Sequence, residues 1–324
     1  MYTKILNFIV GRIKRQANFA PGGAAAEEHT IEYVIATPTH WKGTQLLNDF
    51  EEALQKTKEI EHAKSKVIVT KAEMVSPFLH ELKADVLCQN FNVDHLSFEE
   101  NTKYAILDIG TTACELTILT SKKDAKDQAG EPIRTPWSKT VENLFLEMLD
   151  SMFGATVMNK FKTDKAGVLE LLLSFEKIKT SKDIFKLNAK PEPLPMPCAL
   201  LDQLSNELIN TYLKAGNTIR EKNSHISEEE KKDYFLCISP EQVQELFEPM
   251  LKIIEETIYK HFSNDQNSDI KCVCIIGGYA NTKLVHKKAR KCFPERTVVI
   301  PKEADIVVVQ GAVYYGYKYI NDKK

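Results

Sequence analysis

Two glycine-containing segments have the residue types and spacing of a phosphate-binding site. Asp108-Ile-Gly-Thr-Thr112 lies between two apolar runs, and Gly277-Gly278 follows a third apolar run far downstream. Glycine lets backbone amides approach a phosphate closely, and the N-terminus of a following helix adds partial positive charge. Together the two segments can hold a phosphate tail and a nucleoside from opposite sides. Taken singly, each is weak evidence, because a Gly-Gly pair after a strand is more often an ordinary turn than a ligand site.

No other kind of catalytic or metal site is indicated. The eight histidines form no His-x-x-x-His pair, and neither a Gly-x-Ser-x-Gly elbow nor a Walker loop occurs. The seven cysteines are odd in number, which predicts reduced thiols in an intracellular, cytoplasmic protein. Cys272 and Cys274 have no second pair at zinc-site spacing and are predicted to be core thiols. Trp41 and Trp137 are most simply interpreted as core residues.

The composition is that of a folded globular protein. A length of 324 residues fits one large bilobal fold or two domains, and 43% hydrophobic with 27% charged residues excludes a fibrous or mostly disordered chain. A net charge of −2 argues against a general nucleic-acid binder, because phosphate backbones require a basic surplus. No apolar run reaches the roughly 20 residues of a membrane-spanning helix.

The hydrophobic periodicity predicts a mixed α/β order with hairpins and crossover helices. The predicted strands are 31–36, 66–70, 104–109, 114–119, 272–276 and 297–300. The predicted helices are 44–54, one from Thr140 to Gly154, one that begins at the capping box Ser239-Pro-Glu-Gln242, one that begins near Asn281, and 303–320. The polar segment 217–232 is expected to be a solvated helix-loop.

The N-terminal segment is compatible with two interpretations. Residues 1–16 place Ile5, Leu6, Ile9 and Ile13 at helical spacing, with basic residues around them and no acidic residue. An amphipathic transit peptide has this pattern, but it is usually also rich in serine. An ordinary helix that packs its apolar face on the domain is therefore favoured, followed by a loop at 20–26.

In this order, the segments resemble the ATPase domain of the 70-kDa heat-shock protein family, which has the actin-like fold. Within that family they are most similar to the divergent branch named heat shock 70 kDa protein 12. The matching segments are Tyr33–Trp41, Tyr104–Gly110, Pro136-Trp137 with the helix that ends at Gly154, Ile238–Pro240 with its helix, and Ile275–Ala280 through Ile300-Pro301 to Val313.

The resemblance implies two lobes with mixed sheets around a nucleotide cleft. Residues 1–98 would form a partial lobe I, within which 1–26 are the amphipathic helix and loop. Residues 99–300 would form lobe II, and 301–324 would return to lobe I. The family's first phosphate loop would precede residue 1, so we expect lobe I to be incomplete. We also expect this chain to lack the family's peptide-binding domain.

The catalytic half of the implied site departs from the family pattern. Asp108 and Gly110 match the second phosphate loop, but Thr111 and Thr112 stand where glycines are expected and crowd the backbone amides. Lys71 stands at the position of the family's catalytic carboxylate, and a lysine cannot serve as that metal-linked acid or base. Glu73 could replace that carboxylate only after a rearrangement. Asp108 is therefore the single metal ligand retained, and Mg²⁺ binding is not expected.

The nucleoside half matches better. The resemblance assigns Glu176 and Lys179 to the ribose, although Thr180 replaces an arginine and Asn281 stands where some members have one. From spacing alone, Glu176 and Lys179 would be a surface ion pair one helical turn apart. The residues expected to bind ATP or ADP are Gly110, Thr111, Thr112, Glu176, Lys179, Gly277, Gly278 and Asp305.

Three functions remain open at this point. The favoured one is a degenerate, chaperone-like member of the family that binds adenine nucleotide weakly, hydrolyses little or none, and acts by regulating or interacting with unidentified protein partners. The second is a fragment of an active, ATP-hydrolysing chaperone whose first phosphate loop is missing. The third, a sugar-kinase relative, is disfavoured because Pro136-Trp137 and Ser239-Pro240 match the heat-shock branch better.

Overall fold

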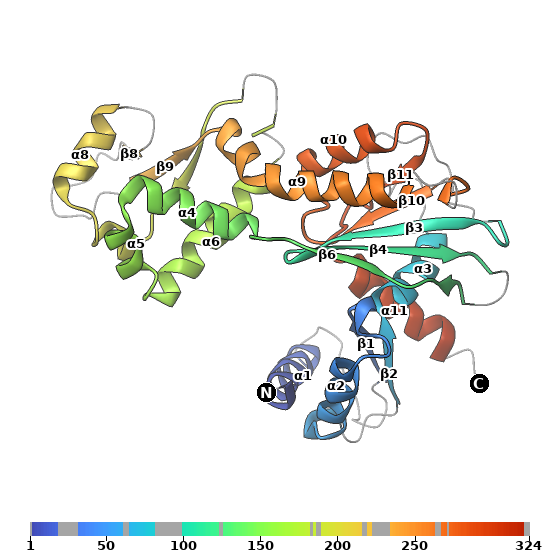
Figure 1. Ribbon diagram of the computed structural model, residues 1–324. Coiled ribbons are helices and arrows are strands. Elements are labelled where there is room, and N and C mark those ends of the chain that lie inside the picture. Colours follow the sequence, from blue (N-terminus) through green and yellow to red (C-terminus); the bar gives the residue numbers. More distant parts are fainter. Residues whose placement is uncertain are drawn as a thin grey trace.

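The computed structural model describes residues 2–18, 32–60, 65–81, 99–122, 126–181, 184–185, 189–215, 219–221, 234–262, 267–270 and 272–320. Its order of helices and strands confirms the predicted mixed α/β class (Figure 1). The loop expected at 20–26 lies outside the described residues, as does most of segment 217–232. Within that segment Ile219–Glu221 form strand β8, so the predicted helix-loop is wrong there.

A two-stranded parallel sheet and its helices form the N-terminal part. Its elements are α1 (Tyr2–Asn18), β1 (Glu32–Thr37), η2 (Thr39–Trp41), α2 (Gln45–Gln55), η3 (Lys58–Ile60) and β2 (Ser65–Thr70). Helix α1 is the predicted amphipathic helix, and it packs through Val10 against Leu54 and Ile60. Ile9 and Ile13 were expected on the packed face, but they are exposed. The packed face is thus narrower than the sequence pattern suggested.

The central sheet is mixed and has the strand order β11-β10-β3-β4-β5, with β6 also paired to β4. Its strands are β3 (Lys103–Ile109), β4 (Ala113–Thr120), β5 (Gln128–Ala129), β6 (Ile133–Pro136), β10 (Cys272–Ile276) and β11 (Thr297–Val299). β10 runs parallel to β3 and β11, whereas β3 and β4 form the predicted antiparallel hairpin. Strands β3 and β10 are buried on both faces, which explains their continuous apolar runs.

Helices cover both faces of this sheet, as Figure 1 shows. On one face, side chains such as Leu107 belong to the large core that includes residues of α9 (Pro240–Phe262) and α10 (Lys283–Cys292). On the other face, Tyr104 and Ile106 pack against α3 (Lys71–Glu81). The last helix, α11 (Val307–Ile320), packs on α3 and β1 and so joins the two sheets.

The remaining elements surround a small antiparallel sheet of order β7-β9-β8. They are α4 (Val141–Phe153), α5 (Ala155–Phe161), α6 (Lys165–Lys179), β7 (Glu192–Pro195), α7 (Cys198–Leu201), α8 (Asn206–Ala215), β8 and β9 (Tyr234–Ile238). Local signals set their ends as predicted. Thr140 caps α4, which stops at Gly154 (φ 88°), and Ser239 and Gln242 exchange the two hydrogen bonds of a capping box at α9. No helix among these described residues is long and apolar enough to cross a membrane.

A buried carboxylate fixes α3 to the central sheet. Asp127 Oδ2 accepts hydrogen bonds from Ser76 Oγ (2.7 Å), His80 Nε2 (2.8 Å) and the Tyr104 hydroxyl (2.5 Å). Its Oδ1 accepts one from the Lys122 backbone N–H (3.0 Å). Burial alone would raise the pKa of Asp127, but these hydrogen bonds outweigh it and lower the pKa from 3.8 to about 2. The folded state therefore favours the ionised carboxylate.

Replacing Asp127 with asparagine is expected to reduce the free energy of unfolding at pH 7 by about 1–2 kcal/mol. A carboxylate whose pKa is lowered by folding stabilises the protein above its unfolded pKa, and the effect disappears as pH falls from about 4 towards 2. Urea denaturation at pH 7 and pH 3 measures this difference. Glu131→Gln, at an exposed position nearby, is the matched control. An equal loss for both variants at pH 7 would contradict the assignment.

Candidate functional site

The β3–β4 hairpin brings two carboxylates to one place. Asp108 and Glu115 are directly opposite each other in the antiparallel register, so their side chains lie on the same face of the sheet. That face is the one that α3 covers, and both residues are buried, with 7% and 8% of their surface exposed. The turn between the strands is closed by a hydrogen bond from Gly110 N–H to the Ala113 carbonyl (3.0 Å). The predicted phosphate loop therefore places a pair of buried acids beside its turn.

Each of these carboxylates has a basic partner from the N-terminal part of the chain. Lys71, the first residue of α3, places Nζ 2.9 Å from Asp108 Oδ2. His40, in η2, places Nδ1 2.6 Å from Glu115 Oε2. Burial raises the pKa of Asp108, Lys71 lowers it and Glu115 raises it, with a net increase. The ammonium therefore only partly compensates for the cost of placing two acids together out of water.

These residues do not fit a magnesium ion. Mg²⁺ prefers octahedral coordination by oxygen atoms, with one or two carboxylates and several waters. Among the described residues, no group of three histidine, cysteine, aspartate or glutamate side chains is arranged to hold a metal. The Asp108 carboxylate is engaged by Lys71, whose positive charge would repel a divalent cation.

Glu73, considered as a substitute for the missing catalytic carboxylate, is bound elsewhere. Its Oε1 accepts from Lys42 Nζ (2.9 Å), and its Oε2 accepts from the Thr70 hydroxyl (2.7 Å) and backbone N–H (3.1 Å). Burial would raise the pKa of Glu73, but the Lys42 and Thr70 hydrogen bonds lower it below its usual value. Glu73 is thus held ionised at the start of α3, apart from the Asp108 pair.

The Gly277-Gly278 turn packs directly on the hairpin. Gly277 has φ 103°, and a Cβ there would lie 2.6 Å from the Ile109 carbonyl oxygen and in contact with Asp108 Oδ1. Tyr279 N–H donates to the same Ile109 oxygen (3.1 Å). Gly278 is exposed, and a Cβ there would meet only the Thr111 methyl, at 3.8 Å. The structure therefore brings together the two glycine segments that the sequence separates.

Trp137 connects the hairpin turn to the core. It is buried, as predicted, and its indole Nε1–H also donates to the Gly110 carbonyl (3.0 Å). Its backbone N–H donates to the Thr112 carbonyl (3.0 Å). These bonds hold both ends of the turn, while the side chains of Thr111 and Thr112 remain exposed.

The predicted nucleoside residues form a second cluster around a buried lysine. Lys179, only 2% exposed, contacts Glu142 Oε1 and Glu176 Oε2, the latter at 2.6 Å. Its Nζ also lies 4.7 Å from the centre of the Tyr279 ring, and the Tyr279 hydroxyl donates to Glu142 Oε2 (2.6 Å). The Glu176–Lys179 pair exists as the spacing indicated, but Lys179 is buried instead of lying at the surface. Within this cluster, the Glu176 side chain is half-exposed.

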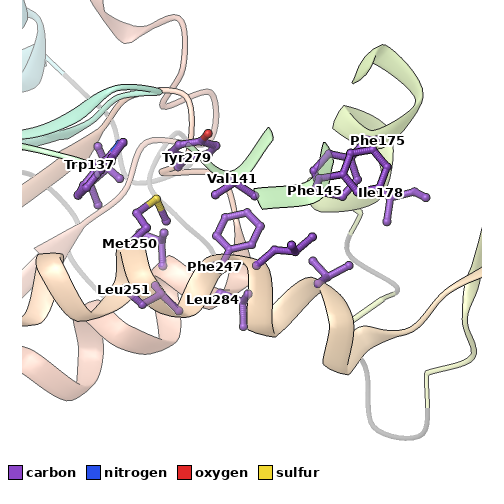
Figure 2. Packing of buried hydrophobic residues seen from close by; sticks show 14 of the residues in the cluster. Trp137, Val141, Phe145, Phe175, Ile178, Phe247, Met250, Leu251, Tyr279 and Leu284 are labelled. Atoms are coloured by element: carbon purple, nitrogen blue, oxygen red, sulfur yellow. The ribbon is translucent and has the colours of Figure 1, made fainter. Parts of the chain in front are cut away.

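The cluster around Lys179 is built into the hydrophobic core. Figure 2 shows the Tyr279 ring near Trp137, Val141 and Phe247, and the Phe145 and Phe175 rings together near Ile178. Phe145 and Phe175 stack with their centres 4.0 Å apart, which joins α4 to α6. Burial and the Glu142 carboxylate raise the pKa of Tyr279, so its phenol remains a hydrogen-bond donor. Because Tyr279 follows Gly278, it ties the glycine turn to the lysine cluster.

Asp305 lies next to the glycine turn. Asn281 Nδ2 donates to Asp305 Oδ1 (2.7 Å), and Asn281 Oδ1 accepts from Ala304 N–H (3.2 Å). The Ala304 carbonyl in turn accepts from Gly277 N–H (2.9 Å). The structure thus links Asp305 to the hairpin side of the site.

Sequence reasoning missed His40, Glu115, Glu142 and Tyr279 as members of these clusters. One of them had a usable signal. In a hairpin that pairs Ile109 with Cys114, the residue opposite Asp108 must be Glu115. The other three contacts depend on how elements distant in sequence pack together.

Comparison with known proteins agrees with the architecture. No protein-family model matches the chain. The sequence is similar to proteins named heat shock 70 kDa protein 12A in Mus musculus and Homo sapiens, with 24% identity to each over 229 residues, or 67% of this chain. The matched region is 32% of each relative, so the chain spans about a third of their length. The mixed α/β architecture and this similarity support the actin-like ATPase fold and a family relationship to the 70-kDa heat-shock proteins.

Proposed function

We propose that this chain is a chaperone-related protein that binds adenine nucleotide without hydrolysing it and acts by regulating or interacting with other proteins. The observation that carries the proposal is the 2.9 Å contact between Lys71 Nζ and Asp108 Oδ2. Transfer of a phosphoryl group to water requires metal-holding carboxylates and a group that orients the water. By the family resemblance, Lys71 stands where one such carboxylate is expected. Its ammonium pairs with the second carboxylate, Asp108.

The nucleotide would bind at the exposed side of the clusters. Gly278, Thr111, Thr112 and Asp305 are exposed at the hairpin end, and Glu176 is exposed at the other end. Glu176 can accept hydrogen bonds from ribose hydroxyls, while buried Lys179 and Tyr279 hold the surrounding elements in place. The cytoplasm is the compartment we propose, because the seven cysteines are odd in number and are spread along a long chain, which is typical of reduced thiols.

Titration calorimetry with ATP and ADP, together with a phosphate-release assay, tests the proposal. We expect measurable nucleotide binding and no phosphate release above the protein-free rate. Glu176→Ala should weaken binding about fivefold, because one or two hydrogen bonds are lost, and Gly278→Val should weaken it at least tenfold by filling the approach to the turn. Glu170→Ala, exposed on the same helix, should have no effect. Unchanged affinity in both site variants would show that the nucleotide binds elsewhere or not at all.

The alternative is that the complete protein hydrolyses ATP with a first phosphate loop supplied from outside this sequence. The relatives are about three times as long as the matched region, so this alternative concerns a longer polypeptide. Robust magnesium-dependent turnover by that polypeptide, abolished by Asp108→Asn, would favour it over the proposed function.

A further inference from the structure

The Lys71 ammonium occupies the position beside Asp108 where a bound cation would contact the carboxylate. Asp108 and Glu115 are buried side by side on one sheet face, and the N-terminus of α3 begins at Lys71, above that face. Two buried acids in register need positive charge nearby, because the desolvation and repulsion of both are otherwise uncompensated. Here the charge comes from the protein itself, through the Lys71 ammonium on Asp108, while His40 Nδ1 makes a hydrogen bond with Glu115 Oε2.

Lys71 is placed to face a ligand as well as Asp108. About a third of its side chain, 35%, is exposed, whereas the Asp108 side chain is 10% exposed. An ammonium has three N–H donors, and the Asp108 contact uses one of them. Lysine is a common phosphate-binding residue, and the positive end of the α3 helix dipole reinforces its charge.

We propose that the Lys71 ammonium takes the place of a divalent cation in this site, so that the site selects a nucleotide that carries no metal. The proposal has two parts. The selectivity for metal-free nucleotide rests on the proposed nucleotide binding. The replacement of the metal by Lys71 is independent of nucleotide binding. Free ATP and ADP carry more negative charge than their magnesium complexes and are attracted more strongly to a fixed ammonium. A Mg²⁺ ion bound to the nucleotide would be repelled by the Lys71 ammonium. It also could not bind the Asp108 carboxylate, because Lys71 already pairs with that group.

The first test measures metal binding without nucleotide. Wild-type protein should show no change in melting temperature when 10 mM MgCl₂ or MnCl₂ is added at constant ionic strength. Lys71→Met keeps the length of the side chain but removes its charge, so Asp108 and Glu115 become a site for the added cation. The melting temperature of this variant should rise by about 2–4 °C with metal. If it does not fold, Lys71→Gln replaces it in the same measurement.

Two controls isolate the carboxylate pair. Lys42→Met removes a neighbouring lysine that pairs with Glu73, and this variant should not respond to metal. Asp108→Asn in the Lys71→Met background should abolish the response. A metal-dependent shift in wild-type protein, or the absence of a shift in both folded Lys71 variants, would overturn the replacement of metal by Lys71.

The second test compares nucleotide affinity in EDTA and in excess MgCl₂. Wild-type protein should bind ADP about threefold to tenfold more tightly in EDTA, because a fixed unit charge at a partly exposed site discriminates by roughly this amount. Lys71→Glu should reverse the preference. Tighter wild-type binding in MgCl₂ would overturn the selectivity. No nucleotide binding in either buffer would instead refute the proposed function, and the metal measurements would still decide the role of Lys71.

Discussion

Gly277→Ala is expected to lower the free energy of unfolding by about 3 kcal/mol or more, the largest effect of any single methyl group in this site. Two causes act together. A non-glycine residue is strained at φ 103°, and the added Cβ would lie 2.6 Å from the Ile109 carbonyl oxygen, well inside normal contact. The clash is with backbone and with the Asp108 carboxylate, neither of which can move away without breaking the hairpin packing.

Gly278→Ala is the matched control for this prediction. Gly278, the next residue in the same turn, does not have a positive φ, and an added Cβ there would meet only the Thr111 methyl, at 3.8 Å. We expect a change within about 0.5 kcal/mol, as for other surface substitutions. Urea denaturation of both variants, followed by far-ultraviolet circular dichroism, measures the difference. Equal stabilities of the two variants would show that Gly277 does not pack on Asp108 and Ile109 as described.

Glu142→Ala is expected to destabilise the protein by about 3 kcal/mol, because it removes the less solvent-exposed of the two carboxylates that pair with the buried Lys179 ammonium. Glu142 contacts both Lys179 and the Tyr279 hydroxyl, and its side chain is 23% exposed. Glu176 contacts the same lysine but is 50% exposed, so Glu176→Ala should cost less than about 1 kcal/mol. Chemical denaturation of the two variants gives the comparison.

A double variant tests the cause of that loss. Lys179→Met combined with Glu142→Ala removes the buried charge as well as its partner, and it should recover much of the stability lost in Glu142→Ala. Burial would raise the pKa of Glu142, but hydrogen bonds from Lys179 and Tyr279 lower it below its ordinary 4.5. Its contribution to stability is thus present above pH 4.5 and disappears as pH falls through the folded pKa. A double variant as unstable as Glu142→Ala would contradict the buried-charge explanation.

The two clusters have different parts in the proposed function. In the proposed function, the Lys71–Asp108 ion pair sets the charge that the phosphates would meet, and this pair and the His40–Glu115 hydrogen bond connect the N-terminal sheet region to the central hairpin. The Lys179 cluster supports the Gly277-Gly278 turn from within the core, through Tyr279. Variants in the first cluster should therefore change metal and nucleotide preference, whereas variants in the second should change stability first.

The sequence alone determined the elements whose signals are local. The hairpin around Gly110, the cap and stop of α4 at Thr140 and Gly154, and the capping box at Ser239 all depend on residues within a few positions of one another. Hydrogen bonds and side-chain periodicity over such short spans depend little on the rest of the chain. The mixed α/β class followed from these elements.

Only the tertiary structure decided which charged groups meet. Lys71 and Asp108 are 37 residues apart, His40 and Glu115 are 75 apart, and Glu142 and Lys179 are 37 apart. Each pair forms because separate helices and strands pack to bury apolar surface, and no sequence spacing encodes that approach. Lys179 shows the same limit, since its position one turn after Glu176 indicated a surface pair, but the packing of Tyr279 and α4 buried it. The sequence thus identified the residue types available for chemistry, whereas packing determined their partners and exposure.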